Sequence, residues 1–187
     1  MTTKTLPRAT FDDLMKVDGK AELINGRIVP IMTTGILPNR VAKRILIALD
    51  PFVVASGVGE VYTDNLGYTM DPPLASGRQS FSPDVSYFTG VLPANLMKFV
   101  EGAPTFAVEV RSENDYGPKP DREYAEKRTD YFAAGTLVVW DVDPIAETVT
   151  AYSAAHPLAA TVFRRGDVAD AEPAVPGWRL SVDTLFV

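Results

Sequence analysis

The fold is decided by two short segments, FSPDVSYF at residues 81–88 and TFAVEVRS at residues 105–112. Both are rich in apolar and β-branched residues, which predicts two strands. Each strand also contains one carboxylate, Asp84 or Glu109, and a charge in such a strand is costly to bury unless another group compensates it. If the two strands are neighbours, the two carboxylates can share a cation.

The period of a strand sharpens this hypothesis. Successive side chains alternate between faces, so Glu109 and Arg111 point to the same side. Asp84 follows Pro83 and therefore stands early in its strand. Mg²⁺ binds such oxygens at about 2.0–2.1 Å and keeps several waters. The alternative is that Asp84 caps a turn and that Glu109 forms an ion pair with Arg111 or another base, since ion pairs near strand ends are common.

Outward from these segments, the pattern predicts one α/β (α+β) domain over residues 1–187 with a mixed central sheet flanked by helices. The expected helices span residues 10–15, 39–55 (ended or kinked by Pro51), 93–99 and 121–134. A hairpin is expected at residues 21–31 around Asn25-Gly26. Further strands are expected at residues 57–63, 66–70, 137–142, 148–152, 160–164 and 178–180.

The composition limits the chemistry that this chain can perform. The sequence has no cysteine, which excludes disulfides, thiolate metal sites and thiol nucleophiles, and its single histidine is His156. A Ser-His-Asp triad or a site with several histidines is therefore not expected. Any catalysis must depend on carboxylates and amines.

The termini and the charge suggest where the protein acts. The amino-terminal residues lack the apolar core of a signal peptide, and no apolar run is long enough to span a membrane, so a cytoplasmic protein without a membrane partner is expected. The formal net charge is -6. Such a charge disfavours non-specific adhesion to nucleic acid, although cations held by a carboxylate cluster would reduce that penalty locally.

Five motifs in a fixed order resemble the Uma2 family, also called DUF820, over residues 10–155. They are ELING at residues 22–26, EVYTDNLGY at residues 60–68, SPDVS at residues 82–86, VEV at residues 108–110 with Ser112, and EKR at residues 126–128 with Tyr131, Ala134 and Gly135. Trp140 and the Val142-Asp143-Pro144 turn follow the last motif. That family is a branch of the PD-(D/E)XK restriction-endonuclease-like nucleases. Each motif alone is weak, and their common order is specific.

The resemblance implies a set of functional residues. Asp84 and Glu109 match the two acidic metal ligands, and the main-chain carbonyl of Val110 would be a third ligand. Glu22 matches the acidic residue of the amino-terminal element, which can reach the metal directly or through water. In the superfamily a lysine usually stands two residues after the Glu, where this chain has Arg111.

In Uma2-like proteins the lysine is moved to the following helix, which here is Lys127. Lys127 is therefore expected to be the catalytic amine. Arginine stays protonated, so Arg111 is expected to contact phosphate or to pair with Glu109.

These residues imply a Mg²⁺- or Mn²⁺-dependent endonuclease that hydrolyses phosphodiester bonds in DNA. The rival prediction is a catalytically inactive binding or interaction domain that keeps the nuclease fold, and the acidic charge and Arg111 favour it. RNA and branched DNA stay open as substrates. A two-fold homodimer would present two metal sites to two strands; Tyr152, Phe163 and Trp178 are either core residues or part of such a surface.

Overall fold

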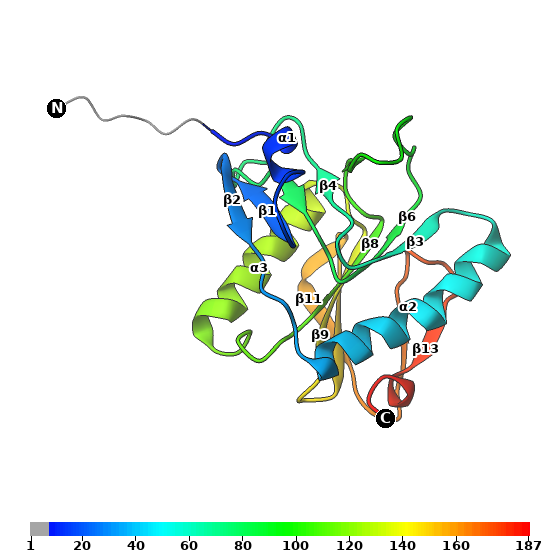
Figure 1. Cartoon of the computed structure of the whole chain (residues 1–187). Helices are drawn as coiled ribbons and strands as arrows, with labels where there is room; N and C mark the ends of the chain where they lie inside the picture. Colours follow the sequence, from blue (N-terminus) through cyan, green and yellow to red (C-terminus); the bar gives the residue numbers. More distant parts are fainter. Residues whose placement is uncertain (1–7) are drawn as a thin grey trace.

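A computed structural model describes residues 8–187 (Figure 1). The prediction about a signal peptide concerns mainly residues 1–7, which lie outside the described residues. The elements are α1 (Phe11–Leu14), β1 (Ala21–Ile24), β2 (Arg27–Pro30), α2 (Ile36–Ser56), β3 (Glu60–Thr63), β4 (Tyr68–Thr69), β5 (Ser80–Phe81), β6 (Val85–Phe88), β7 (Val100–Glu101), β8 (Phe106–Val110), α3 (Pro118–Ala133), β9 (Val138–Asp143), β10 (Thr148–Ser153), β11 (His156–Phe163), β12 (Val168–Asp170), β13 (Arg179–Ser181) and a short 3-10 helix (Val182–Thr184).

A mixed six-stranded sheet forms the centre of the fold, in the order β11-β10-β9-β8-β6-β3. Strands β8 and β9 are parallel, and all other neighbours in this sheet are antiparallel. Parallel neighbours need a crossover connection, and α3 supplies it between β8 and β9. Strands β8 and β9 are buried on both faces except at the end of β9, as their continuous apolar sequence predicts.

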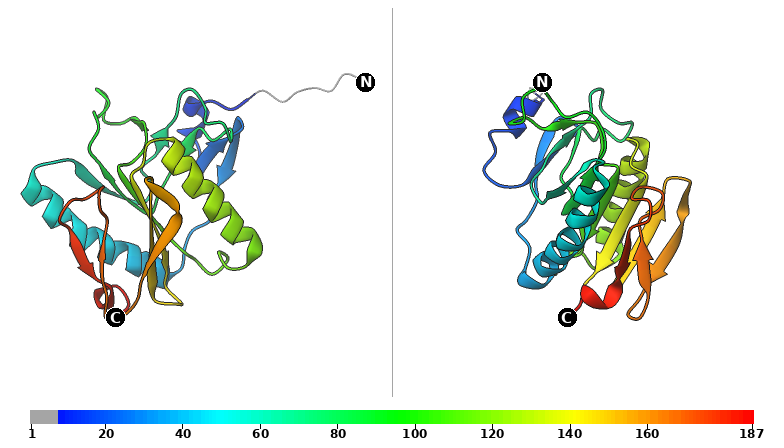
Figure 2. Two further views of the ribbon diagram at one scale, coloured as in Figure 1. Left: turned by 180° about the vertical axis from the view of Figure 1, so that it is seen from behind. Right: turned by 90° about the vertical axis from the view of Figure 1, so that its right-hand side faces the viewer.

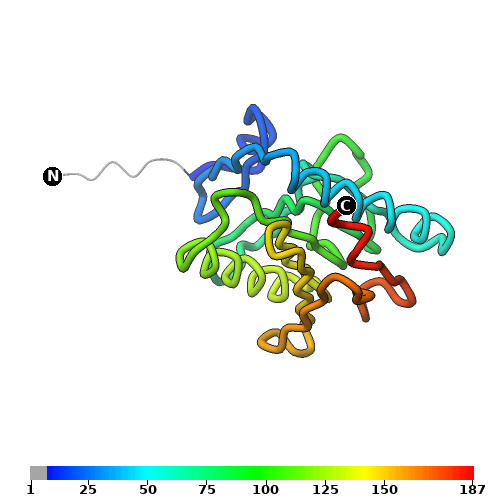
Figure 3. Tube along the Cα trace, turned by 90° about the horizontal axis from the view of Figure 1, so that it is seen from below, coloured from blue at the N-terminus to red at the C-terminus, as the bar shows by residue number. Residues whose placement is uncertain are grey.

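Helix α2 covers one face of this sheet, and α3 covers the other face (Figures 2 and 3). The side of α2 that faces the sheet buries four apolar residues, Val41, Ile45, Leu49 and Val53. On the other face, Tyr131 of α3 packs with Ala107 and Val139. The predicted α+β class and its mixed central sheet are confirmed.

The first of the two deciding segments is broken into two strands rather than forming one. Strand β5 pairs with β4 in a small sheet, whereas β6 pairs with β8 in the central sheet. Residues 82–84 cross between the two sheets, and Pro83 lies in this crossing, where its missing N–H is tolerated. The break places Asp84 directly before β6, at the end of the central sheet.

The predicted hairpin at residues 21–31 is confirmed as β1 and β2. Asn25 and Gly26 both have positive φ, 53° and 68°, as the mirror-image turn of a two-residue hairpin requires. Asn25 N–H donates to the carbonyl of Gly77, so the loop before β5 lies against this turn. The hairpin is thereby fixed beside the crossing that carries Asp84.

Several predicted elements are wrong in detail. Helix α2 begins at Ile36 and continues through Pro51 to Ser56, because Leu49 and Val53 on either side of the proline are both buried in the core and their packing outweighs one lost hydrogen bond. Residues 93–99 form turns and bends and not a helix. Strands β3 and β4 belong to different sheets, so Asp64-Asn65 connects two sheets instead of closing a hairpin.

The carboxy-terminal segment completes the core under α2. Trp178 is 2% exposed and stacks on Trp140 with ring centroids 5.3 Å apart, so it is a core residue and not a self-association surface. Tyr152 and Phe163 are half-buried.

Within residues 8–187 there is no helix with the length and apolarity needed to cross a membrane. The predicted homodimer stays a prediction.

Candidate active site

The candidate site is built around Glu109 and Lys127, which come from β8 and α3. The Nζ atom of Lys127 lies 2.9 Å from Oε1 of Glu109 and 3.0 Å from Oε1 of Glu22 on β1. The hydroxyl of Tyr131, one helical turn after Lys127, also donates to Oε1 of Glu109 at 2.6 Å. An i, i+4 spacing puts Lys127 and Tyr131 on one face of α3, so both side chains reach the same carboxylate.

Asp84 lies at the end of the same sheet, beside the strand that carries Glu109. Its Oδ2 atom accepts a 2.8 Å hydrogen bond from the N–H of Val110, and its own N–H donates to the carbonyl of Val108. Its Oδ1 atom lies 3.0 Å from Nζ of Lys20, which also contacts Asp64 at 2.5 Å. Asp84 is thus held on the edge of β8 by the main chain and is paired with a lysine.

Glu22 is almost completely buried and is held from three sides. Besides Lys127, it accepts a hydrogen bond from the N–H of Ser82 at 3.1 Å and forms an ion pair with the guanidinium of Arg78. Arg78 also donates through Nε to Asp130 on α3 at 2.8 Å. A buried arginine that bridges carboxylates on β1 and α3 stabilises their relative positions, since its fork-shaped head can satisfy both.

Arg111 does not take part in this cluster. It points to the same side of β8 as Glu109 but forms a two-pronged pair with Asp141 of β9, at 2.9 and 2.8 Å. Its Nη1 atom contacts Asp121 at 2.6 Å, and the guanidinium stacks 4.9 Å from the ring centre of Tyr124. The ion pairs of Arg111 within residues 8–187 therefore lead to Asp141 and Asp121, and the expected pairing with Glu109 is wrong.

Burial and neighbouring charges shift the pKa values of this cluster in opposite directions. Burial raises the pKa of Glu109, and although Lys127 opposes this, nearby Asp84 raises it further. Burial alone would lower the pKa of Lys127, but Glu109 and Glu22 outweigh it and raise the pKa above its usual range. Burial likewise opposes ionisation of Glu22, yet Lys127 and Arg78 lower its pKa. The two carboxylates thus favour the ammonium form of Lys127.

The structure brings Glu22, Glu109 and Lys127 together, with Asp84 and Val110 at the adjoining edge of β8. Two participants are not found by the sequence reasoning above. Lys20 could have been found from the sequence, because it stands two residues before Glu22 and the alternation of a strand puts both side chains on the same side. No sequence pattern indicates Arg78, because it stands in an irregular loop and contacts Glu22 and Asp130 only through the tertiary fold.

The donor set agrees with a small divalent cation in its chemistry. Asp84 and Glu109 provide hard oxygen ligands, which Mg²⁺ and Mn²⁺ prefer. Among residues 8–187, no group of three or more acidic, histidine or cysteine side chains could hold a metal ion. Two carboxylates would thus need the main-chain carbonyl of Val110, water or substrate oxygens to complete the coordination, and the ammonium groups of Lys20 and Lys127 balance their charge when no cation is bound.

Comparisons with known proteins identify the family and the fold of this chain. Residues 8–183 match the sequence model of a family named Uma2, described as "Putative restriction endonuclease". The fold is similar to the "Crystal structure of a putative nuclease belonging to DUF820 from Anabaena variabilis ATCC 29413", with a TM-score of 0.73 and 19% sequence identity, covering 95% of this chain and 97% of that chain. A search of curated proteins found no match. At such low identity the structural likeness establishes the fold alone.

Proposed function

This chain belongs to the Uma2 family of restriction-endonuclease-like proteins, and on that premise we propose that it is a metal-dependent endonuclease that hydrolyses phosphodiester bonds in DNA. The observation that supports the proposal most is the meeting of Lys127 with Glu109 at 2.9 Å. The two residues stand on separate elements, α3 and β8, and neither element needs this charge pair to fold into a helix or a strand. A buried lysine and carboxylate beside a second acidic residue are typical of a catalytic site.

In this proposal Asp84, Glu109 and the carbonyl of Val110 would hold Mg²⁺ or Mn²⁺. The cation would supply polarisation of the scissile phosphate and a lower pKa for the water beside it. Glu22 keeps Lys127 in place, because it binds the same ammonium group and is itself fixed by Arg78 and Ser82.

Lys127 acts as a charged donor. Its ammonium group orients the attacking water and stabilises the negative charge that develops on the phosphate oxygens. The water oxygen forms a bond to phosphorus and gives up a proton to solvent, while the P–O3′ bond breaks and the leaving 3′-oxyanion takes up a proton from solvent. The products are a 5′-phosphate and a 3′-hydroxyl. Arg111 lies beside the site and is paired with Asp121 and Asp141. It can contact phosphate only by releasing one of them, and Asp121 is the more exposed of the two.

Cleavage of plasmid and oligonucleotide DNA with Mn²⁺ tests the proposal, with single-stranded RNA and branched DNA as parallel substrates. Wild-type protein is expected to cut DNA, and Asp84→Asn or Glu109→Gln to abolish cutting while the protein remains folded. Glu113→Gln, an exposed acidic residue in the loop after β8, is the matched control and is expected to cut normally. Cutting that persists in Asp84→Asn, or in excess chelator, would contradict the assignment.

A second candidate function is a catalytically inactive binding domain with the nuclease fold. It is favoured by one observation: Lys20 and Lys127 already neutralise the two acidic residues that would hold the metal. Calorimetric titration with Mn²⁺ separates the two functions. Mn²⁺ binding that Glu109→Gln weakens supports the nuclease, whereas no binding, or binding that this variant leaves unchanged, supports the inactive domain.

A further inference from the structure

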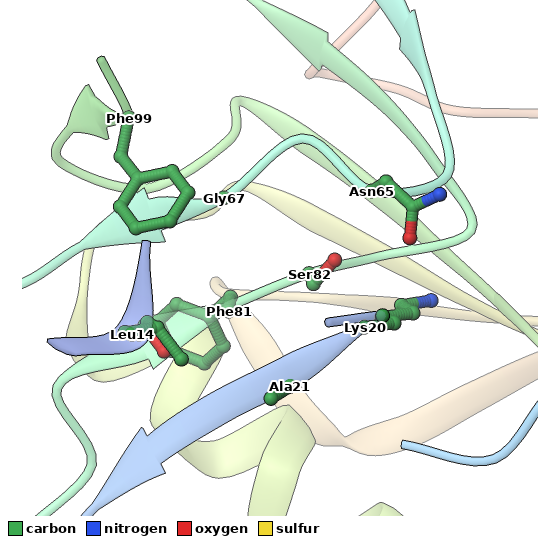
Figure 4. Close-up of a pocket in the computed structure, with 10 residues that line it drawn as sticks. Leu14, Lys20, Ala21, Asn65, Gly67, Phe81, Ser82 and Phe99 are labelled. Carbon is green, nitrogen blue, oxygen red and sulfur yellow. The ribbon is translucent and has the colours of Figure 1, made fainter. Parts of the chain in front are cut away.

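A cavity of about 270 Å³ lies beside the candidate site and has no part in the chemistry described so far (Figure 4). Lys20 and Ser82 connect the two places. Lys20 lines the cavity and binds Asp84, and Ser82 lines it while its N–H binds Glu22. The complete lining is Leu14, Gly19, Lys20, Ala21, Asn65, Gly67, Ser80, Phe81, Ser82 and Phe99.

Phe81 and Phe99 line the apolar side of the cavity, and Phe99 is the one whose ring is partly exposed, because the Phe81 ring is covered by Tyr131 and by the guanidinium of Arg78, 5.4 Å from its centre. Phe81 is fully buried, and its ring stacks on Tyr131 with centroids 4.2 Å apart, so its position is fixed by the same tyrosine that binds Glu109. The ring of Phe99 lies against Gly67, where a Cβ atom would come within 2.5 Å of it. Only a glycine permits this close approach, and the ring is thereby held at the edge of the cavity.

The other side of the cavity is polar, and the two carboxylates nearest to it, Asp64 and Asp84, are paired with Lys20. Lys20, Asn65 and Ser82 offer an ammonium group, an amide and a hydroxyl, and none of the lining residues is acidic (Figure 4). A flat molecule with apolar faces and a hydrogen-bonding edge would find both kinds of surface. A phosphate beside it could reach the ammonium group of Lys20 by replacing Asp64 or Asp84.

We propose that this cavity binds one unstacked base of the nucleic-acid substrate, from a nucleotide next to the phosphodiester that is cut. The proposal rests on the function proposed above. Aromatic side chains bind unstacked bases through their faces, and amide and hydroxyl groups reach base edges. Lys20, between Asp84 and the cavity, would set the distance from the base to the scissile phosphate. A base in the cavity would therefore position the substrate for cutting.

The test uses binding in the presence of chelator, where no cutting takes place. Single-stranded oligonucleotides carry one 2-aminopurine, whose fluorescence is quenched by stacking on neighbouring bases, at successive positions. We expect wild-type protein to raise the fluorescence at one position when anisotropy shows saturation. Phe99→Leu is expected to lose that rise and to bind about tenfold more weakly, within the range measured for removal of an aromatic stacking partner.

Two further variants make the result specific. Leu96→Ala changes an exposed residue of the same loop that does not line the cavity, and it is expected to behave as wild type. Asn65→Gly removes the amide at a residue whose φ is 78° and is expected to weaken binding without unfolding the turn. Circular dichroism and thermal unfolding confirm that each variant is folded.

The outcomes separate this proposal from the proposed function. Oligonucleotides that bind and are cut with Mn²⁺, but show no fluorescence rise or the same rise with Phe99→Leu, would overturn the base site and leave the nuclease standing. A rise that depends on Phe99 in a protein that never cuts would retain the base site and overturn the nuclease. A protein that binds no oligonucleotide in chelator would overturn the base site, and cleavage of plasmid DNA with Mn²⁺ would decide the nuclease separately.

Discussion

Arg111 and Lys127 are two basic residues that lie close to the same sheet face, and they differ in what surrounds them. Arg111 forms a two-pronged pair with Asp141 and is stacked on Tyr124, so its charge joins β8 to β9. Lys127 forms single contacts with Glu22 and Glu109, beside Asp84. Its ammonium group has three donors and a flexible stem, so it can exchange a carboxylate for a substrate oxygen.

The difference shows that position along a strand is a poor guide to function. Arg111 stands two residues after Glu109, where the resemblance seen in the sequence leads one to expect a lysine, yet it forms an ion pair between two strands of the sheet. Lys127 comes from a different element and reaches Glu109 only because α3 crosses over β8. In the proposed mechanism the amine is therefore supplied by α3, and the strand position after Glu109 holds an ion pair within the sheet.

The largest expected effect concerns Lys127. Lys127→Met should lower the DNA cleavage rate by at least about 100-fold, because the charge that orients water and stabilises the phosphate is lost. The rate is measured with saturating Mn²⁺ and compared per folded molecule. Arg122→Met, an exposed basic residue earlier on α3, is the matched control, and its rate should not change. Equal rates for Lys127→Met and wild type would remove Lys127 from the mechanism.

Lys127→Arg sharpens the same comparison. Arginine is always protonated, so a residue that serves as a charged donor should be partly replaced by it, whereas a residue that must give up a proton should not. We expect Lys127→Arg to cut DNA faster than Lys127→Met and more slowly than wild type, since the larger head fits the pocket less well. If the arginine variant is as slow as the methionine variant over a range of pH, lysine acts as a base and the proposed role is wrong.

Arg111→Met should have a smaller effect, and on a different quantity. Asp141 is 7% exposed and loses its two-pronged partner, so the free energy of unfolding should fall by about 2–3 kcal/mol. For a chain of this size that corresponds to a melting temperature lower by about 5 to 10 °C. The cleavage rate per folded molecule should stay within a few-fold of wild type. A loss of rate as large as that of Lys127→Met, without a loss of stability, would show that Arg111 contacts phosphate.

Asp121→Asn should have the smallest effect. Its side chain is 55% exposed, and exposed ion pairs contribute less than about 1 kcal/mol. Thermal unfolding should therefore barely change, and Arg111 should remain bound to Asp141. A destabilisation as large as that of Arg111→Met would mean that Asp121, and not Asp141, is the partner that holds the guanidinium.

Much of this protein could be predicted from local sequence. Alternation and apolar runs indicate β8 and β9, Asn25-Gly26 indicates the hairpin, and a 3.6-residue period indicates the buried side of α2. These predictions succeed because each depends on residues that are neighbours in the chain. The boundaries fail where burial elsewhere decides, as at Pro51, which stays inside α2 because the residues around it are in the core.

The sequence by itself also limited the chemistry: without cysteine and with one histidine, thiol chemistry and sites with several histidines are excluded, and carboxylates and amines become the main candidates. Tertiary structure decided which of them meet. The segment at residues 81–88 is divided between two sheets, so Asp84 lies at the edge of β8. Lys20 pairs with Asp84, Arg78 pairs with Glu22, and Arg111 pairs with Asp141. The physical reason is that a buried charge must find a partner in space, and the partner available depends on how distant elements cross.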